Sequence, residues 1–136
     1  IIIFDDYAHH PTEIKATLSS IKSAYKDRRI IAIFQPHRYS RTELLLNYFK
    51  DAFEYADNLI ITDIYAAGEN EISGISGETI FDIVKNGNNK TKYIKNIDDI
   101  IPELDKMKKD GDIILTLGAG NISRISNEYA KKLLDS

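Results

Sequence analysis

Short apolar runs rich in isoleucine recur along the chain, separated by stretches long enough to hold one helix each. Most of these runs do not alternate with polar residues, which is typical of strands buried on both faces of a sheet. The runs, of which the fourth is the weakest, are Ile1–Phe4, Ile30–Phe34, Leu59–Ile61, Tyr93–Ile94 and Ile113–Leu117. The pattern therefore predicts a sheet whose strands lie inside the protein.

Between the runs, apolar residues stand three and four positions apart, the spacing of one buried helical face. This spacing predicts one helix through Ile14–Tyr25, a second through Leu45–Ala56 and a last one through Ile122–Leu133. The predicted helix signals are Pro11 in a first turn, the S-x-x-E capping box of Ser40 and Glu43, the N-caps Ser76 and Asp98, and the closing residues Gly87 and Gly111.

Regular alternation of strand and helix predicts an α/β fold with right-handed crossovers. We expect a Rossmann-like three-layer sandwich, with a mainly parallel sheet of about five to six strands and helices on both faces. The segment Asp63–Gly77 is the least regular and is interpreted as a long loop, with room for an extra edge strand. The whole chain, residues 1–136, fits one domain with its own core.

Composition and charge narrow the possible functions. The chain has no cysteine, so disulfides and thiolate metal sites are excluded. With 18 basic and 21 acidic residues and no long basic block, no role in binding nucleic acid is expected. No apolar run approaches the roughly 20 residues of a membrane span and no signal peptide is recognisable, which favours a cytoplasmic location. The chain begins without Met inside an apolar run, so we expect a fragment of a larger protein.

The stretch DDYAHHPTE places two carboxylates, a phenol and two imidazoles directly after the first apolar run. In an open α/β sheet, ligands bind at the carboxyl ends of the strands, where this stretch falls. Asp5 and Asp6 could accept hydrogen bonds from ribose hydroxyls or hold a cation, and Tyr7 could stack on a ring. His9 or His10 could meet a phosphate or carboxylate. The alternative is a polar strand-to-helix turn with His10 as the N-cap.

The stretch FQPHRYSRT follows the second run and leads into the next predicted helix. Arg38 and Arg41 flank the predicted helix start, and guanidinium groups are the preferred bidentate partners of carboxylates and phosphates. Backbone N–H groups at a helix start add affinity for anions, so this loop, which also holds His37, predicts an anion site. The alternative is a solvated basic turn whose arginines pair with Glu43 or Asp6.

Two further stretches carry weaker signals. TDIYAAGE, after the third run, contains Asp63, Tyr65 and Glu69, whose carboxylates could receive an ammonium group, although an ordinary polar loop explains it at least as well. LGAGN, after the last run, is a glycine turn that could let the backbone approach a phosphate. No G-x-x-x-x-G-K-[ST] loop occurs and GAGNIS does not fit G-x-G-x-x-G, so the chain alone has no cradle for nucleotide phosphates.

In this order and at these predicted strand ends, the four stretches resemble the C-terminal domain of the Mur ligase family, and in particular of its alanine-adding members. The resemblance runs from about Ile3 to the last helix. It implies an enzyme of peptidoglycan synthesis with a UDP-sugar domain, a P-loop ATPase domain and the present domain, which closes over the site. It further implies that ATP, assisted by Mg2+, converts the carboxylate of UDP-N-acetylmuramate to an acyl phosphate, which the amine of L-alanine attacks.

The resemblance also implies which residues contact ATP. Asp6 would face the ribose, and Tyr7 and His9 would line the space near ATP and the amino acid. The ATP phosphates and Mg2+ would be bound mainly by the central ATPase domain, and no metal ligand is assigned within this chain. The isolated domain is therefore expected to be inactive.

In the same way, Arg38 and Arg41, with His37 beside them, would hold the carboxylate of L-alanine and counter charge near the reacting phosphate. They would position and stabilise rather than exchange protons. One departure from the family pattern is Asn121, which stands where an aspartate is usual and puts any acidic role there in doubt.

Three alternatives remain open at this stage. The related ligase that recycles murein tripeptide shares the opening motif but differs at HRYSRT, which favours the alanine-adding branch. A receiver-like signalling domain would explain Asp5, Asp6 and Asp63 as an acidic pocket, but the Lys-Pro pair expected after the last strand is replaced by Gly118-Ala119-Gly120. A nucleotide-binding or interaction domain of another kind is the third.

Overall fold

The computed structural model describes residues 1–87 and 90–136, and within that part of the chain it contains one five-stranded sheet. The strands are β1 (Ile2–Asp6), β2 (Ile30–Phe34), β3 (Asn58–Ile61), β4 (Thr91–Tyr93) and β5 (Ile113–Leu117). They lie in the order β1-β5-β2-β3-β4, and every neighbouring pair is parallel. The predicted fold class is confirmed, with five strands rather than six.

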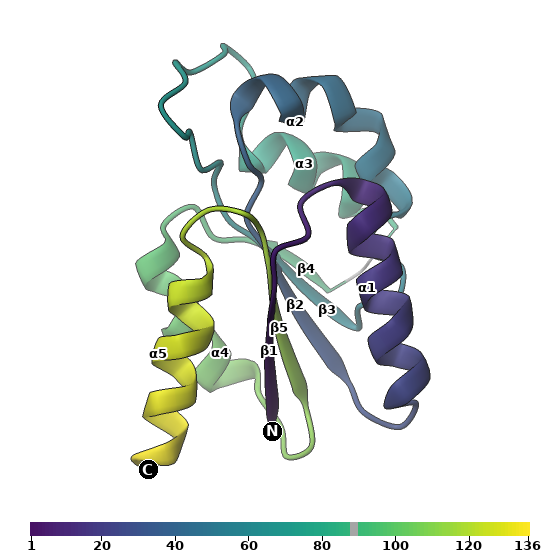
Figure 1. Ribbon diagram of the computed structural model, residues 1–136, viewed down its shortest axis with the longest axis vertical. Helices are drawn as coiled ribbons and strands as arrows, with labels where there is room; N and C mark the ends of the chain where they lie inside the picture. Colours follow the sequence, from purple (N-terminus) through teal and green to yellow (C-terminus); the bar gives the residue numbers. More distant parts are fainter. Residues whose placement is uncertain (88–89) are drawn as a thin grey trace.

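Helices cover both faces of this sheet (Figure 1). One face carries α1 (Pro11–Ala24), α2 (Tyr39–Leu45), the 3-10 helix η1 (Leu46–Asp51) and α3 (Gly77–Val84). The other face carries the 3-10 turn η2 (Ile97–Asp99), α4 (Ile100–Met107) and α5 (Ser123–Leu134). These are the three predicted layers. None of the helices in the described ranges is long and apolar enough to cross a membrane.

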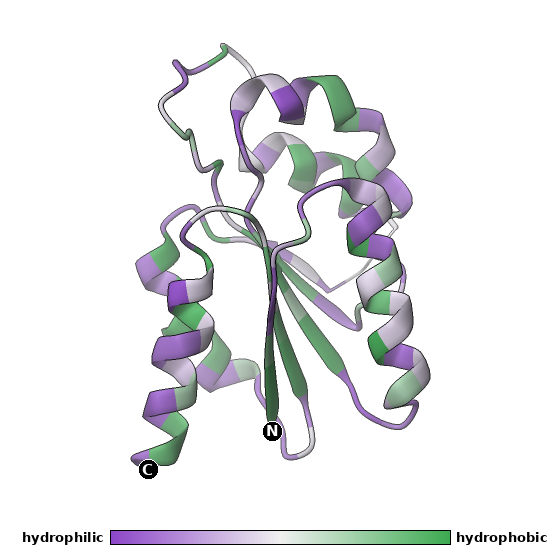
Figure 2. Ribbon diagram, viewed as in Figure 1, coloured by the Kyte–Doolittle hydropathy of each residue, from purple (hydrophilic) through white to green (hydrophobic). Residues whose placement is uncertain are grey.

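Two apolar cores form because successive side chains of a strand point to opposite faces of the sheet. In β2, Phe34 packs on one face against the rings of Phe49 and Phe53, with centroid distances of 5.5 and 5.2 Å. Ile31 and Ile33 point to the other face and join the core under α4 and α5. Figure 2 shows the apolar strands between helices whose outward faces are mostly hydrophilic. The unalternating apolar runs are thus explained by burial on both sides.

Several predicted helix signals are confirmed. The Nδ1 atom of His10 accepts a hydrogen bond from the Thr12 N–H at 3.1 Å, and the Glu13 carboxylate accepts one from the His10 N–H at 3.1 Å. His10 is therefore the N-cap of α1, and Pro11 is its first residue. Ser76 is the N-cap of α3, as expected.

The predicted capping box at the second helix is wrong. The helix α2 begins at Tyr39, two residues earlier than the box requires, and Arg38 is the N-cap residue. Ser40 therefore lies within the helix and does not cap it with Glu43. Its hydroxyl donates instead to the Glu69 carboxylate at 2.6 Å, so a partner from a distant loop replaces the local one.

Other boundaries also differ from expectation. The second helix ends as an α-helix at Leu45 and continues as η1. Asp98 does not cap α4, because it lies in η2, where its N–H donates to the Asn96 side chain at 2.9 Å. Gly111 lies in the turn before β5 with a φ of 85°, and α4 has already ended at Met107.

The two remaining expectations concern turns. Gly87 lies in the turn that closes α3, where its N–H donates to the Val84 carbonyl at 3.0 Å. The segment 63–77 forms no extra strand. It makes one isolated parallel bridge, between Tyr65 and His37 in the loop after β2.

Candidate functional site

The parallel strands bring the four predicted motifs to one edge of the sheet. Hydrogen bonds that extend the ladder beyond the strands fix their relative positions: the Gly118 N–H donates to the Asp6 carbonyl at 3.1 Å, and the Thr62 N–H to the Phe34 carbonyl at 3.0 Å. The predicted gathering at the carboxyl ends of the strands is confirmed. In Figure 1 this edge lies at the top of the sheet, beneath the loops that lead into α1 and α2.

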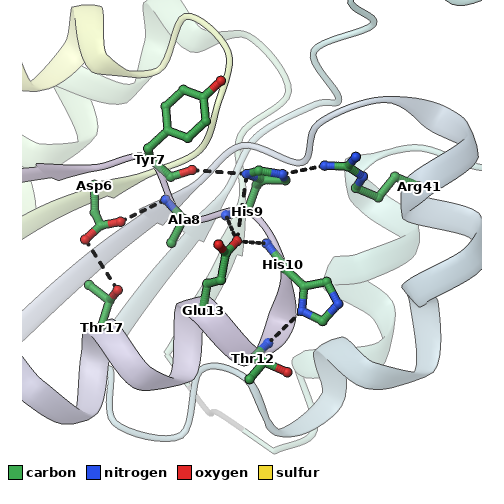
Figure 3. A network of polar contacts seen from close by, with 9 residues as sticks. All are labelled: Asp6, Tyr7, Ala8, His9, His10, Thr12, Glu13, Thr17 and Arg41. Atoms are coloured by element: carbon green, nitrogen blue, oxygen red, sulfur yellow. Dashed lines mark hydrogen bonds and ion pairs between the residues drawn. The ribbon is translucent and has the colours of Figure 1, made fainter.

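Asp6 shapes the turn that leaves β1 (Figure 3). Its Oδ1 accepts a hydrogen bond from the Ala8 N–H at 2.8 Å, and its Oδ2 accepts one from the Thr17 hydroxyl at 3.3 Å. A carboxylate offers about four acceptor sites, so capacity for a ligand hydroxyl remains. The Tyr7 ring meets that of His9 edge-on, with centroids 5.8 Å apart, but it is 71% exposed and can still meet a ligand.

His9 joins the first motif to the second. Its Nδ1 lies 3.1 Å from the Tyr7 carbonyl oxygen, and its Nε2 meets the Nη1 of Arg41 (Figure 3). Because a guanidinium only donates, the Nε2 atom of His9 must be the acceptor and the ring proton must lie on Nδ1. The pairing of the arginines with Glu43 or Asp6, which the alternative interpretation required, does not occur, and a neutral imidazole orients Arg41 instead.

His37 lies in an aromatic stack behind these groups. Its ring is stacked on that of Tyr65 with centroids 5.8 Å apart and an angle of 15°, and it lies 5.6 Å from the ring of His9. The Nδ1 atom is buried, and no partner for it exists in the described part of the protein. Burial lowers the pKa of His37, and the nearby positive charges of Arg38 and Arg41 lower it further. The imidazole is therefore neutral near pH 7.

Arg38 has a backbone conformation that non-glycine residues rarely adopt, with a φ of 67°. Its N–H donates to the Tyr65 carbonyl at 2.9 Å, and its carbonyl accepts from the Thr42 hydroxyl at 2.7 Å. Its side chain is exposed, and across residues 1–87 and 90–136 the guanidinium has no hydrogen-bond or ion-pair partner. Arg38 and Arg41 are thus two cationic groups, three positions apart in the sequence, with donors available for an anion.

The third motif is more structural than chemical. The Oδ1 of Asp63 accepts hydrogen bonds from the N–H groups of Ile64 at 2.9 Å and Gly77 at 3.0 Å, which fixes both ends of the 63–77 loop. Glu69 is bound to Ser40, and the two hydrogen bonds from Ser40 lower the pKa of Glu69. Both carboxylates are therefore engaged within the chain, which favours the polar-loop interpretation over an ammonium site.

Gln35 was not predicted, although it holds the fourth motif in place. It is only 5% exposed, donates through Nε2 to the Asn121 Oδ1 at 2.7 Å, and accepts at Oε1 from the Ile122 N–H at 3.2 Å. The only sequence signal was a polar residue directly after a strand. Asn121 supplies the acceptor that an aspartate would also supply, so the exchange removes a charge but keeps this contact.

The glycine turn of the fourth motif packs against side chains of the same domain. A Cβ atom on Gly120 would lie 2.5 Å from the Tyr65 Cγ and 2.7 Å from the Gln35 Oε1. The glycine is therefore required for packing against these two side chains, and the expected approach to a phosphate is not needed to explain it.

Three open hollows surround the motifs. One of about 400 Å³ lies along β1 and α1 and includes Asp6 and Thr17 in its wall. One of about 440 Å³ lies between Gln35, Asn121 and the loop after β3. The third, of about 500 Å³, is lined by His9, His10, Glu13, Arg41, Leu44 and Leu45. In the described ranges, no three histidine, aspartate or glutamate side chains are grouped so that they could hold a metal ion.

Fold and site together define an open α/β domain of the Rossmann type with two arginines at the carboxyl edge of its sheet. The sequence matches the family described as Mur ligase, glutamate ligase domain, over residues 1–120. The chain belongs to this family, which removes the receiver-like alternative.

Named relatives cover nearly all of this chain. It is 73% identical over 98% of its length to the UDP-N-acetylmuramate–L-alanine ligase of Brachyspira hyodysenteriae, and 48% identical over 98% to that of a Sulfurihydrogenibium species. In both comparisons the chain spans only 29% of the relative.

Solved structures show the same fold. The UDP-N-acetylmuramate-alanine ligase of Thermotoga maritima is similar over 98% of this chain and 27% of its own, with a TM-score of 0.73 and 27% identity. A murein peptide ligase from Psychrobacter arcticus also gives a TM-score of 0.73, with 26% identity over 95% of this chain and 26% of its own. Structural similarity alone therefore does not separate the two kinds of ligase.

Proposed function

We propose that this chain is the C-terminal domain of a ligase that joins L-alanine to UDP-N-acetylmuramate with the energy of ATP, through an acyl phosphate. The observation that carries the proposal is 73% identity over nearly the whole chain to a relative of that name. The arginine pair at the sheet edge supports it, because both substrates of the amide-forming step carry anionic groups. We place the intact enzyme in the cytoplasm.

In this proposal Arg38 and Arg41 hold the carboxylate of L-alanine and balance charge near the reacting phosphate. Both lie at the start of α2, and Arg41 is oriented by the neutral ring of His9. Donors fixed before the substrate arrives stabilise developing charge without reorganising during the reaction. With His37 held neutral beside them, the positive charge of this segment comes from the two guanidinium groups.

The residues of the first motif fit part of a nucleotide. Asp6 borders an open hollow and keeps acceptor capacity for a ribose hydroxyl, and the exposed Tyr7 ring offers a face for stacking. His9 lies between these two residues and Arg41 and lines the adjoining hollow. When bound, ATP supplies the phosphoryl group that activates the carboxylate. We assign its phosphates and Mg2+ mainly to the central domain of the enzyme.

The murein peptide ligase is the second candidate, since its fold is equally similar. The stretch HRYSRT favours alanine addition, because Arg38 and Arg41 both lie in it and present two cations where a single small amino acid would be held. The two candidates differ in the amine substrate that they join to the UDP-sugar, L-alanine or the murein tripeptide, so one assay can separate them.

The test uses the full-length enzyme with ATP, Mg2+, UDP-N-acetylmuramate and either L-alanine or the murein tripeptide. We expect phosphate release and a UDP-sugar product extended by one alanine, with no product from the tripeptide. Turnover with the tripeptide and none with L-alanine would reverse the assignment. The 136-residue chain alone should give neither product, and sustained turnover by it would show that the catalytic machinery has been misplaced.

A further inference from the structure

The conformation of the arginine segment is imposed from outside the helix that carries it. Arg38 is held at a φ of 67°, and such strain persists only where surrounding contacts enforce it. The helix α2 has no side-chain cap that could do so. The contacts come instead from the loop after β3, where the Tyr65 carbonyl accepts from the Arg38 N–H at 2.9 Å and the Tyr65 N–H donates to the Pro36 carbonyl at 2.9 Å.

A second attachment between the same two segments is made by side chains. Both carboxylate oxygens of Glu69 accept from Ser40: Oε1 from the N–H at 3.1 Å and Oε2 from the hydroxyl at 2.6 Å. A tight turn presents the carboxylate, since the Glu69 N–H donates to the Ala66 carbonyl at 3.0 Å and Gly68 has a φ of 85°. Ser40 lies between the two arginines in the sequence, so any shift of Ser40 moves both.

We propose that Glu69 and Ser40 are a positioning pair that sets the direction of Arg38 and Arg41 toward the anionic substrate. Neither residue contacts the substrate in this account, which rests on the proposed function of the arginines. The bidentate contact fixes the first turn of α2 against the loop, while His9, from the turn after β1, orients Arg41. Displacing a substrate-holding group by about 1 Å can reduce a rate about 100-fold, so a loosened pair should have a measurable effect.

The experiment compares Ser40→Ala, Glu69→Gln and the double variant in the full-length enzyme. We expect each single variant to reduce kcat/KM for L-alanine about 10-fold, with the KM for ATP changed less than about twofold. The double variant should be no worse than either single one, because both remove the same contact. Ser40→Thr, which keeps the hydroxyl, should retain at least about half of kcat/KM.

Matched controls come from the same loop. Glu71→Gln and Ser73→Ala alter exposed polar side chains close to Glu69 in sequence and should leave kcat/KM unchanged. If the Ser40 and Glu69 variants lower the melting temperature but stay within about twofold of wild type in kcat/KM, the pair is only structural and the inference is overturned.

A readout independent of activity separates this inference from the proposed function. Amide hydrogen exchange of residues 36–42 in the full-length enzyme should accelerate in Ser40→Ala and Glu69→Gln and remain unchanged in Glu71→Gln. Unchanged exchange in all variants would refute the positioning role. A wild-type enzyme that does not use L-alanine would refute the proposed function, while the exchange data would still decide whether the pair orders the arginine segment.

Discussion

Replacing Arg41 by lysine keeps the positive charge at the sheet edge but removes the planar arrangement of donors. In the structure a guanidinium N–H group of Arg41 is used by His9 Nε2, and Arg41 lines the hollow between α1 and α2. An ammonium group is a point charge whose three donors do not match a carboxylate bidentately. Lysine therefore cannot donate to His9 and bind both oxygens of an anion in one plane.

The magnitude follows from these lost contacts. A hydrogen bond that involves a charged group contributes about 1.5–3 kcal/mol, and removing a preorganised donor from a developing anion costs about 2.7–4 kcal/mol. Because lysine still supplies the charge, we expect a loss of about 2–4 kcal/mol in transition-state stabilisation for Arg41→Lys. This corresponds to a fall in kcat/KM for L-alanine of roughly 30- to 1,000-fold.

The assay is steady-state phosphate release by the full-length enzyme at varied L-alanine. The matched control is Arg124→Lys on α5, where the guanidinium forms exposed ion pairs with Asp98 and Glu128 and should matter little. Thermal unfolding of both variants checks that the fold is intact. A loss smaller than threefold for Arg41→Lys, with the control unchanged, would show that Arg41 contributes charge alone or nothing.

Three further predictions concern stability and protonation. Asp112→Asn should lower the free energy of unfolding by about 3 kcal/mol in urea titrations, because the 3% exposed carboxylate is bound by Arg29 at 2.6 Å. Burial raises the pKa of Asp112, but hydrogen bonds from Arg29 and a backbone N–H lower it below its ordinary 3.8, so this contribution is present above that pH and is lost as the pH falls through the lowered value. Gly77→Ala should lower the free energy of unfolding by about 3 kcal/mol or more and the melting temperature by about 10 °C, because the added Cβ atom would lie 2.2 Å from the Thr62 carbonyl oxygen. In an NMR titration the pKa of His37 should lie below its ordinary 6.5. The unfolded chain then takes up the proton at a higher pH than the folded one, so stability falls as the pH drops below 6.5. A titration midpoint above 6.5 would contradict the burial argument.

The hydrophobic pattern was sufficient to predict the sheet because burial on both faces leaves a direct mark on the sequence. All five positions of β2 and of β5 are buried, and both strands were predicted within their observed bounds. The weakest prediction was β4, an edge strand in which no residue is fully buried. The change from α2 to η1 could not be predicted, since the spacing of Phe49, Ala52 and Phe53 suits the buried face of either helix type.

The caps and the site show where local rules fail. Ser40 and Glu43 satisfy the capping-box pattern, but Glu69 competes for the Ser40 hydroxyl from 29 positions away, and a pattern of four residues cannot contain that partner. Gln35 carried no recognisable signal for the same reason, because its partners Asn121 and Ile122 lie at the far end of the chain. The residue types at the site were predictable, whereas the contacts that orient them were not.

Those long-range contacts explain how the Arg41 side chain and the backbone that carries both arginines can be ordered before a ligand binds. Long side chains on a surface normally lose rotamer freedom when they bind, at about 0.5–1.5 kcal/mol each. Here the contact between His9 and Arg41 and the contact between Ser40 and Glu69 join three strand-end segments around one short helix. Part of that ordering therefore takes place during folding, and the binding energy of the substrate is correspondingly available for orienting the reacting groups.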